Sequence, residues 1–303
     1  MSRRIVTVLA VIFAVVCGAA AFVWLHAGGQ SRTSVTFTPE PPAARSSATP
    51  ESGSAEITKN GNARTKAAKP ELDAAATPAE PAGFAPPIGE TLEFSANVAK
   101  VSNVATLRLS VNGRKEIAGK DAWHLQAFAH TQNPLRMVFE LDDQFDSYSV
   151  PGDFASVQYE MHLSERGQKV QSIQWLTATG REPAPAGASA ARVLPGTRDP
   201  LGMMQYLRSV DWTKTPEVHG PVYDGRKLYE VKARKIGSAE VQVPAGHFST
   251  STVEIRVFDN GAEMKDAHFT LYLAKDSART PVLLEATLPF AEARVQLMKK
   301  SGQ

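Results

Sequence analysis

The chain has 303 residues and a formal net charge of +2, without a basic stripe of the kind that binds nucleic acid. Its one cysteine, Cys17, lies in the apolar N-terminal segment, so the rest of the chain has no disulfide and no cysteine ligand for zinc or an iron–sulfur cluster. Composition divides the chain into an apolar start, a stretch poor in large apolar residues, and a third part long enough for one β domain.

Residues 1–26 are predicted to be a transmembrane signal anchor or a signal peptide. Arg3 and Arg4 precede an apolar run at residues 5–25, which is long enough to cross a bilayer core of about 30 Å. The small residues 19–21 would suit signal cleavage, but the apolar run continues past them, which favours an uncleaved anchor. Basic residues stay on the cytoplasmic side. We therefore expect a single-pass protein of the bacterial inner membrane with its C-terminal domain in the periplasm; the alternative is cleavage and export to the periplasm.

Residues 27–87 are rich in Pro, Ala, Ser and Thr and contain only two aromatic residues, Phe37 and Phe84. Such a segment buries too little apolar surface to offset the entropy of ordering. It is predicted to be a disordered linker that holds a folded domain, residues 88–303, away from the membrane.

Beyond residue 88 nearly every segment alternates apolar and polar side chains with period two, which is typical of strands with one buried face. Turn residues separate these segments. Hairpin turns are predicted at Asn112-Gly113, 165–167, 224–227, 243–246 and Asn260-Gly261. This pattern predicts about eleven strands, mostly antiparallel, and a long loop at residues 181–198.

Residues 199–212 form the one convincing helix of this domain. Asp199 is a suitable N-cap, and Pro200 falls at the first helical position, where its missing N–H costs nothing. Leu201, Met204, Leu207 and Val210 recur at helical spacing. Gly202 is unfavourable in a helix unless the backbone packs closely against a sheet. The predicted fold is therefore mainly β: an antiparallel half-open β-barrel wrapped around one helix.

The sequence contains no familiar catalytic motif. His124 and His130 share a strand face but are too far apart to bind one metal without partners from other strands. A group of acidic residues could serve in general acid–base chemistry, although a solvated rim is the simpler interpretation. It comprises Glu140, Asp142, Asp143 and Asp146. We predict no catalytic residue, no metal and no cofactor.

The remaining candidates for a site are apolar and aromatic. They are Trp123, Tyr159, Met161 and Trp175 on strands, and Met203, Met204 and Tyr206 on the helix. Methionine suits surfaces that accept varied apolar partners, and a curved sheet that does not close leaves a concave site for a ligand. The alternative is that these residues are simply the core.

Three stretches together resemble a known group of bacterial exported proteins. They are DPLGMMQYLRSV (199–210), GPVYDGRKLYEVKARKIG (220–237), and VQVPAGHFST (241–250) followed by LAKDSARTPVLLEATLPF (273–290). Their order is similar to that of domain of unknown function 3108, over roughly residues 88–298. The resemblance implies a half-barrel like those of the lipoprotein carriers LolA and LolB, and it brings no catalytic residues.

We therefore expect a non-enzymatic periplasmic envelope protein that binds a lipid, a lipoprotein acyl chain or another apolar ligand in its half-barrel. The alternative is a scaffold or assembly factor that binds another envelope protein, by pairing with a strand edge. A third hypothesis, an enzyme acting on cell-wall glycan, rests only on the acidic group.

Overall fold

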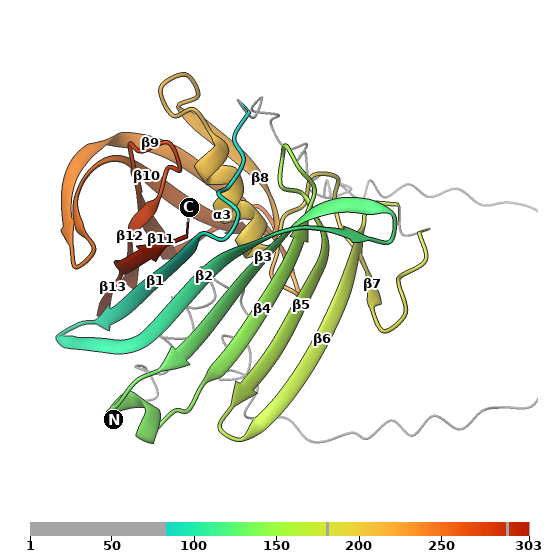
Figure 1. Cartoon of the computed structure of the whole chain (residues 1–303), viewed down its shortest axis with the longest axis horizontal. Helices are drawn as coiled ribbons and strands as arrows, with labels where there is room; N and C mark the ends of the chain where they lie inside the picture. The colour runs from blue at the N-terminus through green and yellow to red at the C-terminus, as the bar shows by residue number, and fades with distance from the viewer. Residues whose placement is uncertain (1–82, 180–181, 289–290, 303) are drawn as a thin grey trace, which may run out of the picture.

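The computed structural model of this protein describes residues 83–179, 182–288 and 291–302 (Figure 1). The predicted anchor at 1–26, and the predicted linker up to residue 82, lie outside these ranges. Within the described part of the chain, none of the helices has the length and apolar character needed to span a membrane. Phe84, which the sequence assigns to the linker, packs against the main core.

The described residues form one sheet of thirteen strands, two more than expected. The strands are β1 Thr91–Val98, β2 Val101–Ile117, β3 Lys120–Thr131, β4 Asp142–Ser149, β5 Ser156–Glu165, β6 Gln168–Thr177, β7 Ser189–Arg192, β8 Glu217–Tyr223, β9 Leu228–Val243, β10 Gly246–Asp259, β11 Ala262–Ala274, β12 Pro281–Leu288 and β13 Ala291–Ser301. Their spatial order is β7-β6-β5-β4-β3-β2-β1-β13-β12-β11-β10-β9-β8. All neighbours are antiparallel except β6 and β7.

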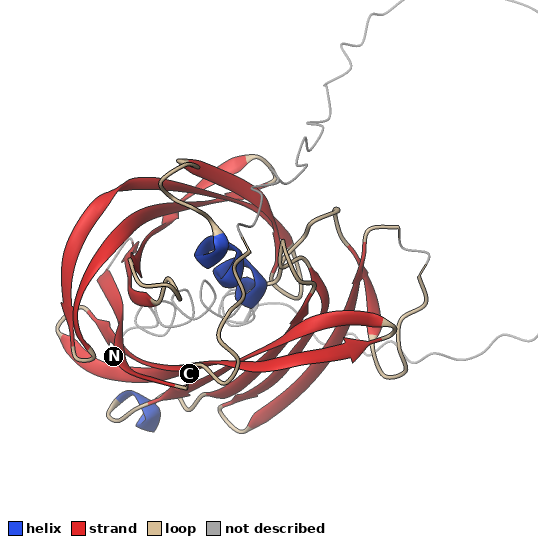
Figure 2. Cartoon of the chain, turned by 45° about the horizontal axis from the view of Figure 1, so that its top comes forward, coloured by secondary structure: helices blue, strands red, loops and turns tan. Residues whose placement is uncertain are grey.

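The sheet curls around one α-helix, α3 (Pro200–Ser209), which lies inside the curve (Figure 2). The two end strands, β7 and β8, do not pair with each other, so the sheet is not closed by strand pairing. The segment before α3 spans the gap instead. Ser156 N–H at the start of β5 donates to the carbonyl of Thr197, and Arg198 exchanges backbone hydrogen bonds with Pro221 and Tyr223 of β8. Strands β6 and β7 therefore extend beyond the curl as an overhang.

Two local predictions were wrong, for reasons that the backbone makes plain. Asn112-Gly113 is not a turn: β2 continues through it with a shift in register, and the hairpin closes at Ala118-Gly119, where both residues have positive φ. The segment 181–198 is not simply a loop, because it contains β7. The predicted turns at 165–167, 224–227, 243–246 and 260–261 do connect neighbouring strands. The ambiguous stretch 135–141 includes the 3-10 helix η1, Leu135–Met137.

Candidate functional site

The N-terminal end of α3 is fixed against β4 and β5 at backbone distance. The carboxylate of Asp199 accepts hydrogen bonds from the N–H groups of Leu201 and Gly202 at 2.8 and 2.9 Å, as the sequence predicts for an N-cap. A Cβ on Gly202 would lie 2.8 Å from the carbonyl oxygen of Phe154 and 2.9 Å from the Ser149 hydroxyl. Glycine is therefore needed here to let the helix approach the sheet this closely, as expected.

The helix contributes three of the predicted ligand-binding residues to the apolar interior of the curl. Met203 and Tyr206 are 7% and 1% exposed, whereas Met204 is only half-buried against the same core. On the facing strands, Trp123, Tyr159 and Met161 are buried in this one cluster. These six residues are brought together, and five of them are almost fully packed.

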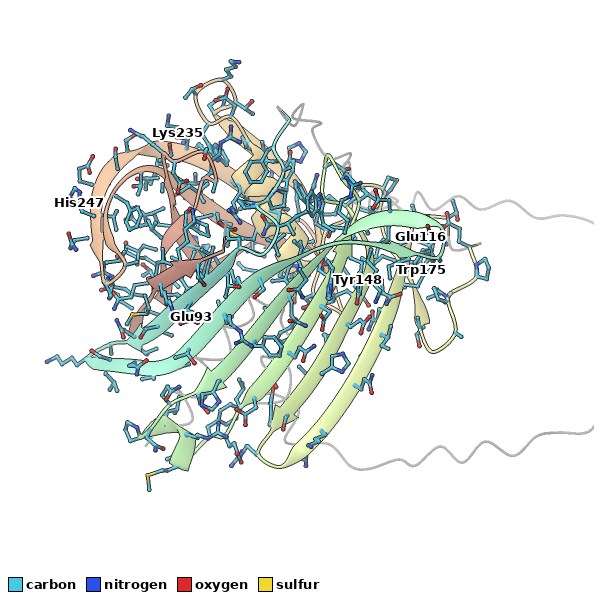
Figure 3. The ribbon with its side chains drawn as sticks, viewed as in Figure 1. Glu93, Glu116, Tyr148, Trp175, Lys235 and His247 are labelled. Carbon is cyan, nitrogen blue, oxygen red and sulfur yellow. The ribbon has the colours of Figure 1, made fainter. Side chains whose placement is uncertain are left out.

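Trp175 is not brought together with the other six. Gln174, its neighbour on β6, contacts residues of the β8–β9 region, so Trp175 points to the opposite face. There it packs in a separate small cluster with Ala122, Tyr148 and Val157; Figure 3 shows Tyr148 and Trp175 close together over the strands. Ala184 and Ala188, from the segment leading into β7, pack against this cluster. Trp175 thus anchors the overhang and does not line the interior.

A seam joins the two ends of the curl beside the helix. The Gln174 side chain on β6 donates to the carbonyl of Gly225 at 2.6 Å and accepts from the Tyr223 hydroxyl. Met161 on β5 occupies the space that a side chain at Gly225 would need. Apart from the backbone hydrogen bonds of Thr197 and Arg198, the two ends of the sheet are therefore joined here by side-chain contacts rather than by strand pairing.

Buried polar groups lie at both ends of the helix. Asp199 is fully buried, and this burial raises its pKa, although hydrogen bonds from Ser147, Ser156 and the helix N–H groups act to lower it. The Arg198 guanidinium lies 3.6 Å from the centre of the Tyr206 ring and donates to the carbonyl of Asp153.

At the other end, Arg208 forms a buried ion pair with Glu90, with Arg208 Nη1 2.7 Å from Glu90 Oε2. The same guanidinium donates to the carbonyl of Ala278. Arg279 donates to the carbonyls of Arg208 and Ser209, so the last two carbonyl groups of the helix have hydrogen-bond partners. Phe84 lies between the two arginines, with its ring centre 5.7 Å from Arg208 and 5.6 Å from Arg279.

The acidic group of the sequence does not form one site. Asp142 binds Arg136 and His130, and Glu140 pairs with Arg136 at 2.8 Å. Asp143 is on the inner face, where its carboxylate accepts from Ser164 N–H at 2.8 Å. Burial raises the pKa of Asp143 to about 7.

Asp146, on the outer face, binds His124 at 2.7 Å. Because these carboxylates do not converge on one site, they give the glycan-enzyme hypothesis no support, and it stays a hypothesis.

The model of one protein family, described as protein of unknown function (DUF3108), matches residues 93–298, which is most of the chain. The chain belongs to the DUF3108 family. No curated protein matches it. Among solved structures, it is similar to a β-barrel-like DUF1849 protein from Brucella abortus at 9% identity, covering 72% of this chain and 98% of that one, with a TM-score of 0.46. A protein with a YmcC-like fold from Bacteroides fragilis has 12% identity, the same coverage and a TM-score of 0.34. Neither likeness carries information on function.

One cluster of possible metal ligands in this DUF3108 chain was not identified from the sequence. Asp146 of β4 and Glu160 and His162 of β5 lie on the outer face, and each offers a ligand atom within 4.8 Å of the others. The sequence shows only Glu160 and His162 two positions apart on a strand. Their proximity to Asp146 depends on the register of β4 against β5, which pairs Asp146 with Glu160.

Proposed function

We propose that this DUF3108 protein is a non-enzymatic binding protein for a slender apolar ligand, such as a lipid acyl chain, held between α3 and the inner face of the sheet. The apolar N-terminal segment supports an envelope location, because basic residues followed by such a run direct the rest of the chain across the inner membrane. The domain would then face the periplasm, where a carrier of acyl chains works.

One observation carries the proposal. A continuous apolar core is bounded on one side by a seam of side-chain contacts. Separating Gln174 from Tyr223 and Gly225 costs side-chain hydrogen bonds but no strand pairing. A chain-like ligand can therefore enter at the seam without unfolding the sheet.

Met204 is the side chain that such a ligand would meet first on the helix. It is the one half-buried member of the six clustered candidates, whereas Leu207 on the same helix is 2% exposed. Methionine adjusts its three flexible bonds at low cost, so it can move aside for an acyl chain.

A test would measure the uptake of a fluorescent fatty acid by the full-length protein in detergent. In a Cys17→Ser background, Gln174→Cys with Tyr223→Cys would be linked across the seam by a short bis-maleimide. We expect uptake by the unlinked protein and at least tenfold weaker uptake once the seam is linked. The control is Thr91→Cys with Ser110→Cys, linked in the same way across β1 and β2, where the native hydroxyls are 3.5 Å apart.

Saturable uptake that linking the seam does not change would place the entry elsewhere. No uptake by the unlinked protein would contradict the proposal, and the scaffold alternative would then lead.

A further inference from the structure

The outer face of β3, β4 and β5 carries a patch of polar side chains that the proposed function does not use. Strand register brings it together: Gln126 pairs with Asp146 and Asp146 with Glu160, while Gln144 pairs with His162. Phe145, Tyr159 and Met161 point into the core, so their strand neighbours point outward. The patch is thus on the face opposite to α3.

Two carboxylates stand directly opposite each other in this patch. Like charges in such a cross-strand pair repel and destabilise a sheet. Among the described residues, no lysine or arginine makes an ion pair or hydrogen bond with Asp146 or Glu160. Elsewhere on the outer surface arginines fill that role: Arg234 and Arg256 pair with Glu254 at 3.0 and 3.2 Å. Within the described ranges, the negative charge of the Asp146–Glu160 pair is therefore not balanced by a lysine or an arginine; the only ion-pair partners are His124 and His162.

Neutral donors hold both carboxylates in place. Asp146 accepts from Gln126 at 2.7 Å and from Gln144 at 2.6 Å, and Glu160 accepts from Gln158 at 2.7 Å. His124 Nε2 also lies 2.7 Å from Asp146 Oδ1. The arrangement fixes negative charge without neutralising it.

An imidazole completes the arrangement. His162 Nε2 lies 3.4 Å from Glu160 Oε2, and its side chain is 35% exposed, so solvent reaches it. The ligand atoms of Asp146, Glu160 and His162 are all within 4.8 Å of one another. Bonds of about 2.0–2.2 Å to zinc put ligand atoms roughly 3.5 Å apart in a tetrahedral site, so the His162–Glu160 distance already fits and the widest pair of atoms must close by about 1 Å.

We propose that Asp146, Glu160 and His162 bind a divalent transition-metal ion of the Zn²⁺ class on the outer face of the sheet. One nitrogen and two carboxylate oxygens suit such an ion, and the exposed side of His162 leaves room for water as a further ligand.

His124 is a positioning residue in this proposal. Its Nε2 lies 2.7 Å from Asp146 Oδ1, and its ring stacks on Tyr148 with 4.8 Å between centres. Hydrogen bonds of this kind orient ligating carboxylates, and their loss costs about 10–100-fold in metal affinity. The bound ion would join β4 to β5 and remove the repulsion between them.

The experiment uses untagged full-length protein, stripped with a chelator, in zinc titrations followed by calorimetry and in thermal unfolding with and without Zn²⁺. We expect one Zn²⁺ per chain and a higher unfolding midpoint with Zn²⁺ but not with Mg²⁺. His162→Gln and Glu160→Gln should abolish both effects, and His124→Gln should weaken binding about 10–100-fold.

Two further readouts make the result decisive. Glu160→Gln should leave the metal-free protein at least as stable as the wild type, because it removes the carboxylate repulsion. The matched control is His268→Gln, which disrupts another outer-face His–Glu pair, 3.2 Å from Glu263, and should leave zinc binding unchanged. Zinc binding that survives both His162→Gln and Glu160→Gln, or no zinc binding by the wild type, overturns the proposal.

Discussion

The two ends of α3 are held in different ways. At the N-terminal end the helix backbone touches β4 and β5, and the buried Asp199 carboxylate is surrounded by neutral donors, the Ser147 and Ser156 hydroxyls and two N–H groups. At the C-terminal end, arginine side chains reach out to Glu90 and to the loop between β11 and β12. The first is contact at backbone distance and the second is charge pairing.

The difference follows from what each end must join. The N-terminal end packs on strands of one half of the sheet. The C-terminal end connects the segment before β1, the helix and the β11–β12 loop, which are separated by 118 and 70 residues along the chain. Long arginine side chains can bridge such separate segments, whereas a glycine contact needs one rigid surface. The two ends should therefore fail in different ways when they are altered.

The largest effect is expected at the C-terminal end. Arg208→Met removes the closer of two cations from the buried Glu90 carboxylate and leaves only Lys300, whose Nζ is 3.8 Å away; loss of a buried partner typically costs about 3–5 kcal/mol of unfolding free energy. Glu90→Gln combined with Arg208→Met removes both charges and should recover a large part of that loss. Denaturant midpoints of the wild type, the single variant and the double variant measure this coupling.

A double variant as unstable as Arg208→Met alone would mean that packing, not charge, governs this end of the helix. The contrast between the two ends would then disappear.

At the N-terminal end, Gly202→Ala tests the close approach of the helix. The new methyl group would meet the Phe154 carbonyl at 2.8 Å, so despite the better helix propensity of alanine we expect a loss of about 1–3 kcal/mol. Gly237→Ala on β9 is the matched control, because a Cβ there meets nothing within 4 Å. Its unfolding free energy should change by less than about 0.5 kcal/mol.

Equal, small effects of Gly202→Ala and Gly237→Ala would show that the helix can move away from β4 and β5.

The same two ends show what the sequence could predict. The helix start was predictable because Asp199, Pro200 and the apolar spacing act locally, and Gly202 signalled a close contact without naming its partner. The Arg208–Glu90 pair was not predictable, because nothing local relates residues so far apart.

Sheet faces were harder to assign than strands. Alternation of apolar and polar residues predicts that Tyr159, Met161 and Trp175 each lie on a buried face of their strand. It does not say which face of the sheet lines the interior of the curl. Trp175 is buried on the outer face because the β7 segment covers it. Asn112-Gly113 resembles a turn, yet alternation on both sides of it continues one strand. Whether the seven candidates bind a ligand stays a prediction.

The smallest effects concern pH, and they should have opposite signs at the two ends. Burial raises the pKa of Asp199, so its contribution to stability is full below the ordinary value of about 3.8 and is lost as pH rises through the folded value. Asp276, in the β11–β12 loop, has a lowered pKa: burial acts to raise it, but Thr280 and Lys300 outweigh this. Its contribution is present above the ordinary value and is lost as pH falls.

Asp199→Asn and Asp276→Asn separate these terms, with unfolding free energies measured between about pH 3 and pH 8. Asparagine caps a helix about as well as aspartate, so Asp199→Asn should match the wild type best at low pH and gain on it as pH rises. Asp276→Asn should instead fall behind the wild type as pH rises through the ordinary carboxyl range, because it lacks a carboxylate that Lys300 stabilises. If the two differences from wild type change with pH in the same direction, the carboxylates at the two ends do not occupy the contrasting environments described here.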